Sequence, residues 1–334
     1  MTETKPPVIG VVGAGAWGTA LACLSARAGQ ETLLWCLETD LAPTINETRQ
    51  NAAFLPDVPI PDGVRATALL ADLQPATHLL MVTPAQHVRT SLGNLSIALQ
   101  RRRPLLLCSK GLERPEAKLM SEVAGEVVPG WPLAVLSGPN FAGEVARGLP
   151  AAATIACADQ ALGEAWMNLL SHAAFRPYLS DDLIGAQIGG AVKNVLAIAC
   201  GVAHGLKLGD NARAGLITRG MAEMVRFALA KGARRETLMG LSGLGDLILT
   251  CSSLTSRNMS FGAALGEGRS AQEILAEQRS VAEGAYTVHA LVAQARALGV
   301  DMPICEGVQA LVDGRVAAHH LMDDLMTRPL KTED

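Results

Sequence analysis

One charged side chain lies near the centre of a long apolar stretch. Lys193 belongs to LIGAQIGGAVKNVLAIACGVA, residues 183–203, in which no other side chain is charged. An ammonium loses free energy when it leaves water, so a buried lysine needs a task. A desolvated lysine has a lowered pKa and can exchange a proton near neutral pH. We expect Lys193 to be a general acid or base, with Asn194 donating a hydrogen bond beside it; a plain ion pair with an acid such as Asp246 is the alternative.

A glycine pattern near the N-terminus predicts dinucleotide binding. VIGVVGAGAWG carries G-x-G-x-x-G at Gly13, Gly15 and Gly18, between a β-rich run and a helical pattern. In that context the glycines permit a tight turn, let the backbone approach a pyrophosphate and let helix and strand pack closely. Ala16 and Trp17 lie in the same turn, where phosphates would meet the positive end of the helix dipole.

An acidic residue follows the second β-rich run. Glu38 comes twenty residues after Gly18, where a carboxylate can accept hydrogen bonds from the adenosine ribose hydroxyls of NAD. No arginine stands beside it to pair with a 2′-phosphate. A loop glutamate with no ligand is the alternative.

Other polar residues follow predicted strands, where doubly wound sheets bind ligands. Lys110 comes after LLLCS, and the next strand ends in SGPNFAGE. There Gly138 and Asn140 belong to the turn, and Ala142 lies at the start of a helix whose free N–H groups can face a ligand.

The C-terminal half adds a carboxylate and a group of residues suited to binding an anion. Asp246 is the one charge in MGLSGLGDLILTC, so it needs a cation or a hydrogen-bonding substrate. Ser256 is a suitable N-cap for a helix with Arg257 and Asn258 in its first turn. A cation at a helix N-terminus costs about 0.3–1 kcal/mol. That conflict disappears if an anion binds there, which the guanidinium and the free N–H groups would share.

The elements that must position these residues change type near Asp182. Before it, continuously apolar strands alternate with helical stretches, which indicates a parallel sheet covered on both faces. These strands begin at Val8, Glu31, His78, Leu105, Leu133, Ala151 and Phe175. Beyond it, helical patterns cover residues 183–203, 212–231, 271–277, 287–298, 304–312 and 316–326. The prediction is an α/β Rossmann-type doubly wound N-terminal domain, residues 1–184, and an all-α C-terminal domain, residues 185–334.

Within the pattern at residues 212–231, Leu216, Ile217, Met221, Met224, Val225 and Ala228 follow helical spacing. Arg219 and Glu223 are four residues apart, which predicts an ion pair on the helix surface. Gly232 is expected to end the helix.

Composition excludes several classes of protein. The 334 residues are 49% hydrophobic and 18% charged with a net charge of −4, which excludes a disordered chain and gives no basic stripe for nucleic acid. The seven scattered cysteines form no C-x-x-C and predict reduced, buried thiols in a cytoplasmic protein. No histidine spacing suggests a metal site, and the start lacks a signal peptide's apolar core. Residues 183–203 are long enough to span a membrane, but the central lysine favours a buried helix.

Taken together, these motifs resemble one family, the bacterial NAD(P)-dependent sn-glycerol-3-phosphate dehydrogenases. The similar stretches follow in order over nearly the whole chain: GAGAWGTALA, NAAFLPDVPIP, SKGLE, LAVLSGPNFAGEVARGLP, IGGAVKNVLAI, NARAGLITRGMAEM, GLGDLILTCSSLTSRN, VAEGAYT and MPICEGV. The resemblance implies a Rossmann domain followed by a helical domain, with NADH or NADPH as coenzyme. It also implies reversible reduction of dihydroxyacetone phosphate to sn-glycerol 3-phosphate, the entry to phospholipid backbones.

The resemblance also implies roles for individual positions. Lys193 would be the general acid/base, and Lys110 would contact both coenzyme and substrate. The substrate pocket would be lined by Gly138, Asn140, Asp246, Ser256, Arg257 and Asn258. The coenzyme would contact Ala16, Trp17, Ala142, Arg257, Val281 and Glu283. Position 140 is more usually Ser or Thr in the family, and Asn can still form hydrogen bonds.

One departure from the family concerns the coenzyme. After LW the family commonly has Gly and then Arg or His, which can hold the 2′-phosphate of NADPH; here Cys36 and Leu37 take those places. The departure favours NADH. Two alternatives stay open at this point: a β-hydroxyacid dehydrogenase of similar build, which acts on a carboxylate, and a non-catalytic dinucleotide sensor. The oligomeric state, a homodimer included, is also left open.

Overall fold

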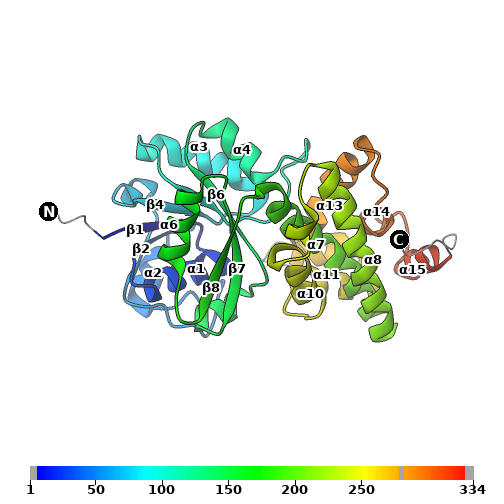
Figure 1. Ribbon diagram of the computed structural model, residues 1–334. Helices are drawn as coiled ribbons and strands as arrows, with labels where there is room; N and C mark the ends of the chain where they lie inside the picture. Colours follow the sequence, from blue (N-terminus) through cyan, green and yellow to red (C-terminus); the bar gives the residue numbers. More distant parts are fainter. Residues whose placement is uncertain (1–5, 278–281, 328–334) are drawn as a thin grey trace. The chain divides into compact units, whose positions relative to one another are not determined.

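The computed structural model describes residues 6–277 and 282–327 and divides into two compact units (Figure 1). The first unit consists of Met1–Lys110 and Lys118–Gln187, and the second of Gly111–Ala117 and Ile188–Asp334. The first contains the sheet, and the second is helical.

The first unit contains an eight-stranded sheet in the order β3-β2-β1-β4-β5-β6-β7-β8. The strands are β1 (Val8–Val12), β2 (Glu31–Trp35), β3 (Val64–Thr67), β4 (His78–Met81), β5 (Leu105–Leu107), β6 (Leu133–Ser137), β7 (Ala151–Ala156) and β8 (Phe175–Ser180). The order reverses between β1 and β4, which is where doubly wound sheets bind their ligands. The Rossmann-type fold is confirmed. The strand β3 was not predicted, because its short sequence VRAT carries an exposed arginine and little apolar signal.

The directions of two strands, β7 and β8, differ from the expectation of a wholly parallel sheet. β7 pairs antiparallel with β6, while β8 is parallel to β7. The link between β6 and β7 contains α5 (Ala142–Arg147), a helix of six residues. Such a helix advances the chain by only about 9 Å. It does not return the chain to the opposite edge of the sheet, so β7 starts from the carboxyl edge of β6 and runs backwards.

Both faces of the sheet are covered, as predicted (Figure 1). One core packs against α1 (Ala16–Arg27), α2 (Leu41–Thr48), α5 and α6 (Gln160–Leu170). The other packs against α3 (Val88–Leu99) and α4 (Met120–Val127). On β4, Leu80 faces the first core, and Leu79 and Met81 face the second. Both faces of this strand are therefore apolar, which explains its unbroken hydrophobic run.

The second unit contains the helices expected after Asp182 and two short ones that were not predicted, over Arg235–Leu238 and Asp246–Cys251. They are α7 (Leu183–Gly205, which begins in the first unit), α8 (Gly209–Ala230), α9 (Arg235–Leu238), α10 (Asp246–Cys251), α11 (Arg257–Gly266), α12 (Ala271–Glu277), α13 (Glu283–Ala297), α14 (Pro303–Val312) and α15 (Ala318–Met326). One π-type turn, Leu241–Gly245, precedes α10. Gly232 follows the end of α8 in a left-handed conformation, as predicted. All seven cysteines are free and buried.

Glycines let other backbones approach α7 closely. A Cβ built on Gly201 would lie 2.1 Å from the carbonyl oxygen of Met259, and one on Gly205 2.2 Å from that of Ala263. In return, a Cβ on Gly262 of α11 would lie 2.1 Å from the oxygen of Ile198. α7 is long and apolar enough to cross a membrane, but 89% of its apolar window is buried inside the structure. Its composition is that of a core helix.

Glu223 of α8 does not form the surface pair expected with Arg219. Its side chain is buried, and its carboxylate accepts hydrogen bonds from the backbone N–H groups of Ile304 (2.7 Å) and Cys305 (3.2 Å) at the start of α14. An anion there stabilises the N-terminal end of the helix dipole. The i,i+4 spacing was misleading because Glu223 faces the neighbouring helix and not the solvent.

This carboxylate makes the stability of the fold depend on pH. Burial raises the pKa of Glu223 from 4.5 to about 7, against the opposing effect of the two N–H groups. The folded chain therefore binds this proton more tightly than the unfolded chain, so its contribution to the free energy of unfolding falls as pH rises from about 4.5 to about 7. Urea unfolding of wild type and Glu223→Gln between pH 4.5 and 8 should show that the variant lacks this component. Parallel pH profiles for the two proteins would contradict the assignment.

Candidate active site

The glycine turn between β1 and α1 has the geometry that the motif predicts. Gly13 has φ = 115°, and a Cβ on Gly18 would lie 1.8 Å from the carbonyl oxygen of Gly13, so neither position accepts a side chain. Gly15 differs, because a Cβ built there would meet no protein atom within 4 Å. Packing within the chain therefore does not require glycine at position 15. The missing side chain leaves space for a group from outside, as a pyrophosphate would need.

The start of α1 offers donors to such a group. The helix has no side-chain cap and no acidic residue in its first turn. Trp17 in that turn has a buried indole Nε1 with no hydrogen-bond partner among the described residues. Ala16 is half-buried beside it. First-turn N–H groups and the positive end of the helix dipole favour a phosphate here, so this part of the chain fits a dinucleotide.

The predicted residues after the neighbouring strands lie at the same edge of the sheet, because β1, β2, β4, β5 and β6 are all parallel. Glu38 and Leu37, after β2, are exposed, whereas Cys36 is buried. Lys110, after β5, donates from Nζ to the carbonyl oxygen of Gly138 at 2.9 Å, which brings two of the predicted positions together.

Asn140 and Ala142 follow β6 at this edge. The Asn140 Nδ2 donates to the carbonyl oxygen of Ala152 at 3.1 Å, and its buried Oδ1 has no partner among the described residues. Ala142 begins α5, as expected, after the N-cap residue Phe141. The carbonyl side of the Asn140 amide is thus held in one orientation and is free to accept a hydrogen bond.

In the second unit Lys193 lies in a buried polar cluster. Its Nζ donates to Asp246 Oδ1 at 2.5 Å and to Thr250 Oγ1 at 2.9 Å. The ion pair that the sequence left as an alternative is therefore present. Asp246 has no exposed surface, whereas Lys193 keeps 7% of its surface exposed. Within the ion pair, the lysine is therefore the member with surface that a substrate could reach.

The backbone before α10 brings Asp246 to Lys193. The turn Leu241–Gly245 has π-type hydrogen bonding, which is frequent at functional sites. A Cβ on Gly189 of α7 would lie 2.1 Å from the carbonyl oxygen of Ser242 in this turn. The approach of α7 to the turn thus depends on glycine four residues before Lys193.

Asn194 and Asn258 connect three helices. Asn258 donates from Nδ2 to Asn194 Oδ1 at 2.9 Å, and its own Oδ1 accepts from the backbone N–H of Gly284 at 2.9 Å. Asn194 donates in turn to the carbonyl oxygen of Gly190 at 3.2 Å. Both side chains are buried, and these bonds fix the orientation of the two amides and join α7 and α11 to the start of α13.

Arg257 begins α11, as predicted. Ser256 is the N-cap, and its Oγ accepts from the N–H of Met259 at 3.3 Å. The Arg257 side chain is exposed to solvent. The surrounding protein still desolvates the guanidinium in part, which lowers its pKa, and the Glu283 carboxylate opposes that shift. Within residues 6–277 and 282–327 the guanidinium has no ion pair or hydrogen bond, so an external anion can bind it. Val281 lies outside the described residues.

Two residues of these sites were missed in the sequence. Thr250 is four positions after Asp246, so the two share one helix face, and that spacing could have revealed it. Asn51 donates to the carbonyl oxygen of Ala14, inside the glycine turn, from 37 positions away. No local pattern identifies a contact of that separation.

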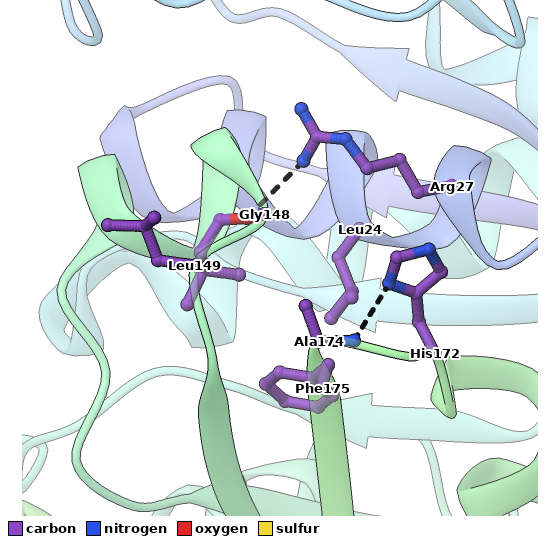
Figure 2. A pocket seen from close by; sticks show the side chains of 8 residues that line it. Leu24, Arg27, Gly148, Leu149, His172, Ala174 and Phe175 are labelled. Carbon is purple, nitrogen blue, oxygen red and sulfur yellow. Dashed lines mark hydrogen bonds between the residues drawn. The ribbon is translucent and has the colours of Figure 1, made fainter.

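A hollow elsewhere in the first unit does not qualify as a ligand site (Figure 2). Its volume is about 10 Å³, room for a single water. Arg27 donates to the carbonyl oxygen of Val145 at 3.3 Å, and His172 Nδ1 accepts from the N–H of Ala174 at 3.3 Å. Dashed lines in Figure 2 mark these bonds of Arg27 and His172.

Comparison with known proteins matches both parts of the chain in order. Residues 8–163 match the model of the NAD-dependent glycerol-3-phosphate dehydrogenase N-terminus, and residues 182–323 match that of the C-terminus. The chain belongs to the NAD(P)-dependent glycerol-3-phosphate dehydrogenase family. A relative from Caulobacter vibrioides, glycerol-3-phosphate dehydrogenase [NAD(P)+], is 54% identical over 97% of this chain and 98% of its own. A relative of the same name from Rhodospirillum rubrum is 53% identical over 97% of this chain and 93% of its own.

Solved structures of glycerol-3-phosphate dehydrogenases have the same fold. The enzyme from Coxiella burnetii superposes with a TM-score of 0.92 at 38% identity and covers 97% of this chain and 99% of its own. The chain is therefore an NAD(P)-dependent oxidoreductase, and the resemblance drawn from its motifs is confirmed. This assignment sets aside the β-hydroxyacid dehydrogenase and the dinucleotide sensor.

Proposed function

We propose that this glycerol-3-phosphate dehydrogenase reversibly reduces dihydroxyacetone phosphate to sn-glycerol 3-phosphate, with Lys193 as the general acid/base. The observation that carries the proposal is the buried Lys193–Asp246–Thr250 cluster, in which the lysine alone of the ion pair keeps exposed surface. The product would supply the backbone of glycerophospholipids.

The coenzyme would be held by the first unit and by the start of α13. The glycine turn and the first turn of α1 would bind the pyrophosphate through backbone N–H groups, and Glu38 would accept hydrogen bonds from the adenosine ribose. The complete proposed set is Gly13, Gly15, Ala16, Trp17, Gly18, Glu38, Lys110, Ala142, Arg257, Val281 and Glu283. The bound nicotinamide supplies or accepts the hydride.

The substrate phosphate would bind Arg257 at the start of α11. The guanidinium provides charge-assisted hydrogen bonds, and the helix N-terminus adds a favourable dipole. The proposed substrate set is Lys110, Gly138, Asn140, Lys193, Asn194, Asp246, Ser256, Arg257 and Asn258. Since Asn194 and Asn258 hydrogen-bond each other, they would act as one rigid pair.

The chemistry of this chain centres on one proton. In the reducing direction the Lys193 ammonium gives a proton from Nζ to the carbonyl oxygen of the substrate, which becomes the C2 hydroxyl. The lysine is left as a neutral amine and regains a proton from solvent. Asp246 and Thr250 accept hydrogen bonds from Nζ and hold it in place. In the oxidising direction the amine removes the same hydroxyl proton.

We further propose a coenzyme domain of residues 1–184 and a substrate and catalytic domain of residues 185–334. The buried, free cysteines support work in the reducing cytoplasm.

Assay of the purified chain tests the function directly. Oxidation of NADH should depend on dihydroxyacetone phosphate, and the reverse reaction should require sn-glycerol 3-phosphate. A β-hydroxyacid should give no reaction. Coenzyme oxidation with the β-hydroxyacid's keto form, but not with dihydroxyacetone phosphate, would overturn the proposal.

Coenzyme choice gives a separate prediction. Leu37 and Glu38 offer no cation to a 2′-phosphate, and Glu38 would repel it, so kcat/KM for NADH should equal or exceed that for NADPH. Leu37 is 71% exposed, so Leu37→Arg should fold normally and raise kcat/KM for NADPH. A tenfold preference of the wild type for NADPH would show that another residue binds the phosphate.

A further inference from the structure

Asn51 hydrogen-bonds the centre of the glycine turn, although it lies after α2 in the sequence. Its Nδ2 donates to the carbonyl oxygen of Ala14 at 2.8 Å and to Thr19 Oγ1 at 2.8 Å. Thr19 Oγ1 also donates to the Ala14 oxygen, at 3.2 Å. Asn51 and Thr19 are each 1% exposed. The Ala14 carbonyl is therefore bonded twice from inside the protein.

The direction of that carbonyl fixes the direction of the next N–H group. The oxygen of Ala14 and the N–H of Gly15 belong to one planar trans peptide, so they point in opposite directions. Because the oxygen points to the buried Asn51, the Gly15 N–H points away from it. If the peptide turned over, the Ala14 oxygen would take the place of that N–H and repel a phosphate.

Little else resists such a rotation. The peptide turns about ψ of Ala14 and φ of Gly15, and glycine accepts conformations with either sign of φ at little cost. A Cβ built on Gly15 meets no protein atom, so no packing at that residue holds it. The two side-chain donors are the specific restraint on this peptide.

We propose that Asn51 is a positioning residue for the coenzyme: it holds the Ala14–Gly15 peptide with its N–H toward the pyrophosphate. The inference rests on the proposed role of the glycine turn. Asn51 itself does not touch the coenzyme in this assignment; it acts through the backbone of Ala14 and Gly15.

Direct NADH binding by calorimetry tests the proposal without depending on turnover. Asn51→Asp is nearly isosteric but cannot donate, and its charge opposes the Ala14 oxygen. It should weaken NADH binding by about 10- to 100-fold, the range expected for a lost buried hydrogen bond. KM for NADH should rise, while KM for dihydroxyacetone phosphate should stay within about twofold.

A matched control lies in the same segment. Asn46 donates from Nδ2 to the carbonyl oxygen of Ala66 at 2.9 Å and accepts from the Ala66 N–H at 2.8 Å, so it ties α2 to β3. Asn46→Asp should lower the melting temperature less than Asn51→Asp does, because Asn46 is exposed, and should change the Kd for NADH by less than about twofold. Equal changes in Kd for the two variants would overturn the proposal, since both asparagines would then be structural only.

Two further variants distinguish a failure of the Asn51 proposal from a failure of the proposed coenzyme site. If Asn51→Asp does not fold, Thr19→Val removes the second donor to Ala14 and should weaken NADH binding by about 2- to 5-fold; an unchanged Kd then counts against the proposal. Gly15→Val should abolish NADH binding by filling the turn. Loss with Gly15→Val but none with Asn51→Asp would reject the role of Asn51 alone, whereas no loss with either would reject the coenzyme site itself.

Discussion

Replacement of Lys193 by methionine should lower kcat by at least ~10²–10⁴-fold, the usual contribution of a general acid or base. Methionine keeps the length of the side chain but has no proton to give to the carbonyl oxygen. The Kd for NADH should change little, because the glycine turn belongs to another unit of the fold. Steady-state kinetics with dihydroxyacetone phosphate and direct coenzyme titration measure the two effects separately.

The ion pair with Asp246 requires a control for stability. Lys193→Met leaves a fully buried carboxylate without its cation, and breaking such a pair typically costs about 3–5 kcal/mol. The double variant Lys193→Met with Asp246→Asn removes both charges and should recover much of that loss while staying inactive. Turnover near that of the wild type in either folded variant would reduce Lys193 to a structural ion.

Replacement of Arg257 by alanine should lower kcat/KM for dihydroxyacetone phosphate by roughly 10- to 1000-fold. A hydrogen bond to a charged group contributes about 1.5–3 kcal/mol, and each ~1.4 kcal/mol corresponds to a factor of ten. A bidentate contact to the phosphate adds directional fit. Arg257 is exposed at the start of α11, so the substitution should leave the free energy of unfolding nearly unchanged.

Two comparisons isolate the phosphate contact. Lysine at position 257 should rescue activity only partly, because an ammonium lacks the planar fork of a guanidinium. Dihydroxyacetone without its phosphate should be a very poor substrate and should lose much less from Arg257→Ala. Equal losses for both substrates would place Arg257 on the coenzyme or the fold, with Lys110 and the Gly138–Asn140 turn as the next candidates for the phosphate.

The features that the sequence determined depend on residues close together in the chain. The glycine turn needs only Gly13 to Gly18, and the cap of α11 needs only Ser256 and the N–H of Met259. The change from strands to helices near Asp182 follows from hydrophobic periodicity. Each of these signals is complete within a few turns of helix or one strand, so a single sequence contains it.

For Lys193 in the apolar helix, the sequence predicted the burial but not all of the hydrogen-bond partners. Its burial was predictable, because the residues on both sides of it are apolar. Its partners were only partly predictable. Asp246 was considered as a counter-ion, but the Thr250 hydroxyl, which also binds Nζ, was not.

Tertiary structure alone decided the contacts between residues that are far apart in the sequence. Examples are the antiparallel pairing of β7 with β6, the hydrogen bonds of the Glu223 carboxylate to α14, and the hydrogen bond of the Asn51 amide to Ala14. No periodicity in the sequence predicts any of them. Glu223 has the i,i+4 spacing of a surface ion pair with Arg219, yet its side chain is buried. Its hydrogen-bond partner Ile304 lies 81 positions later in the chain. The pattern along one helix states which residues share a face, but only the packed fold determines what that face meets.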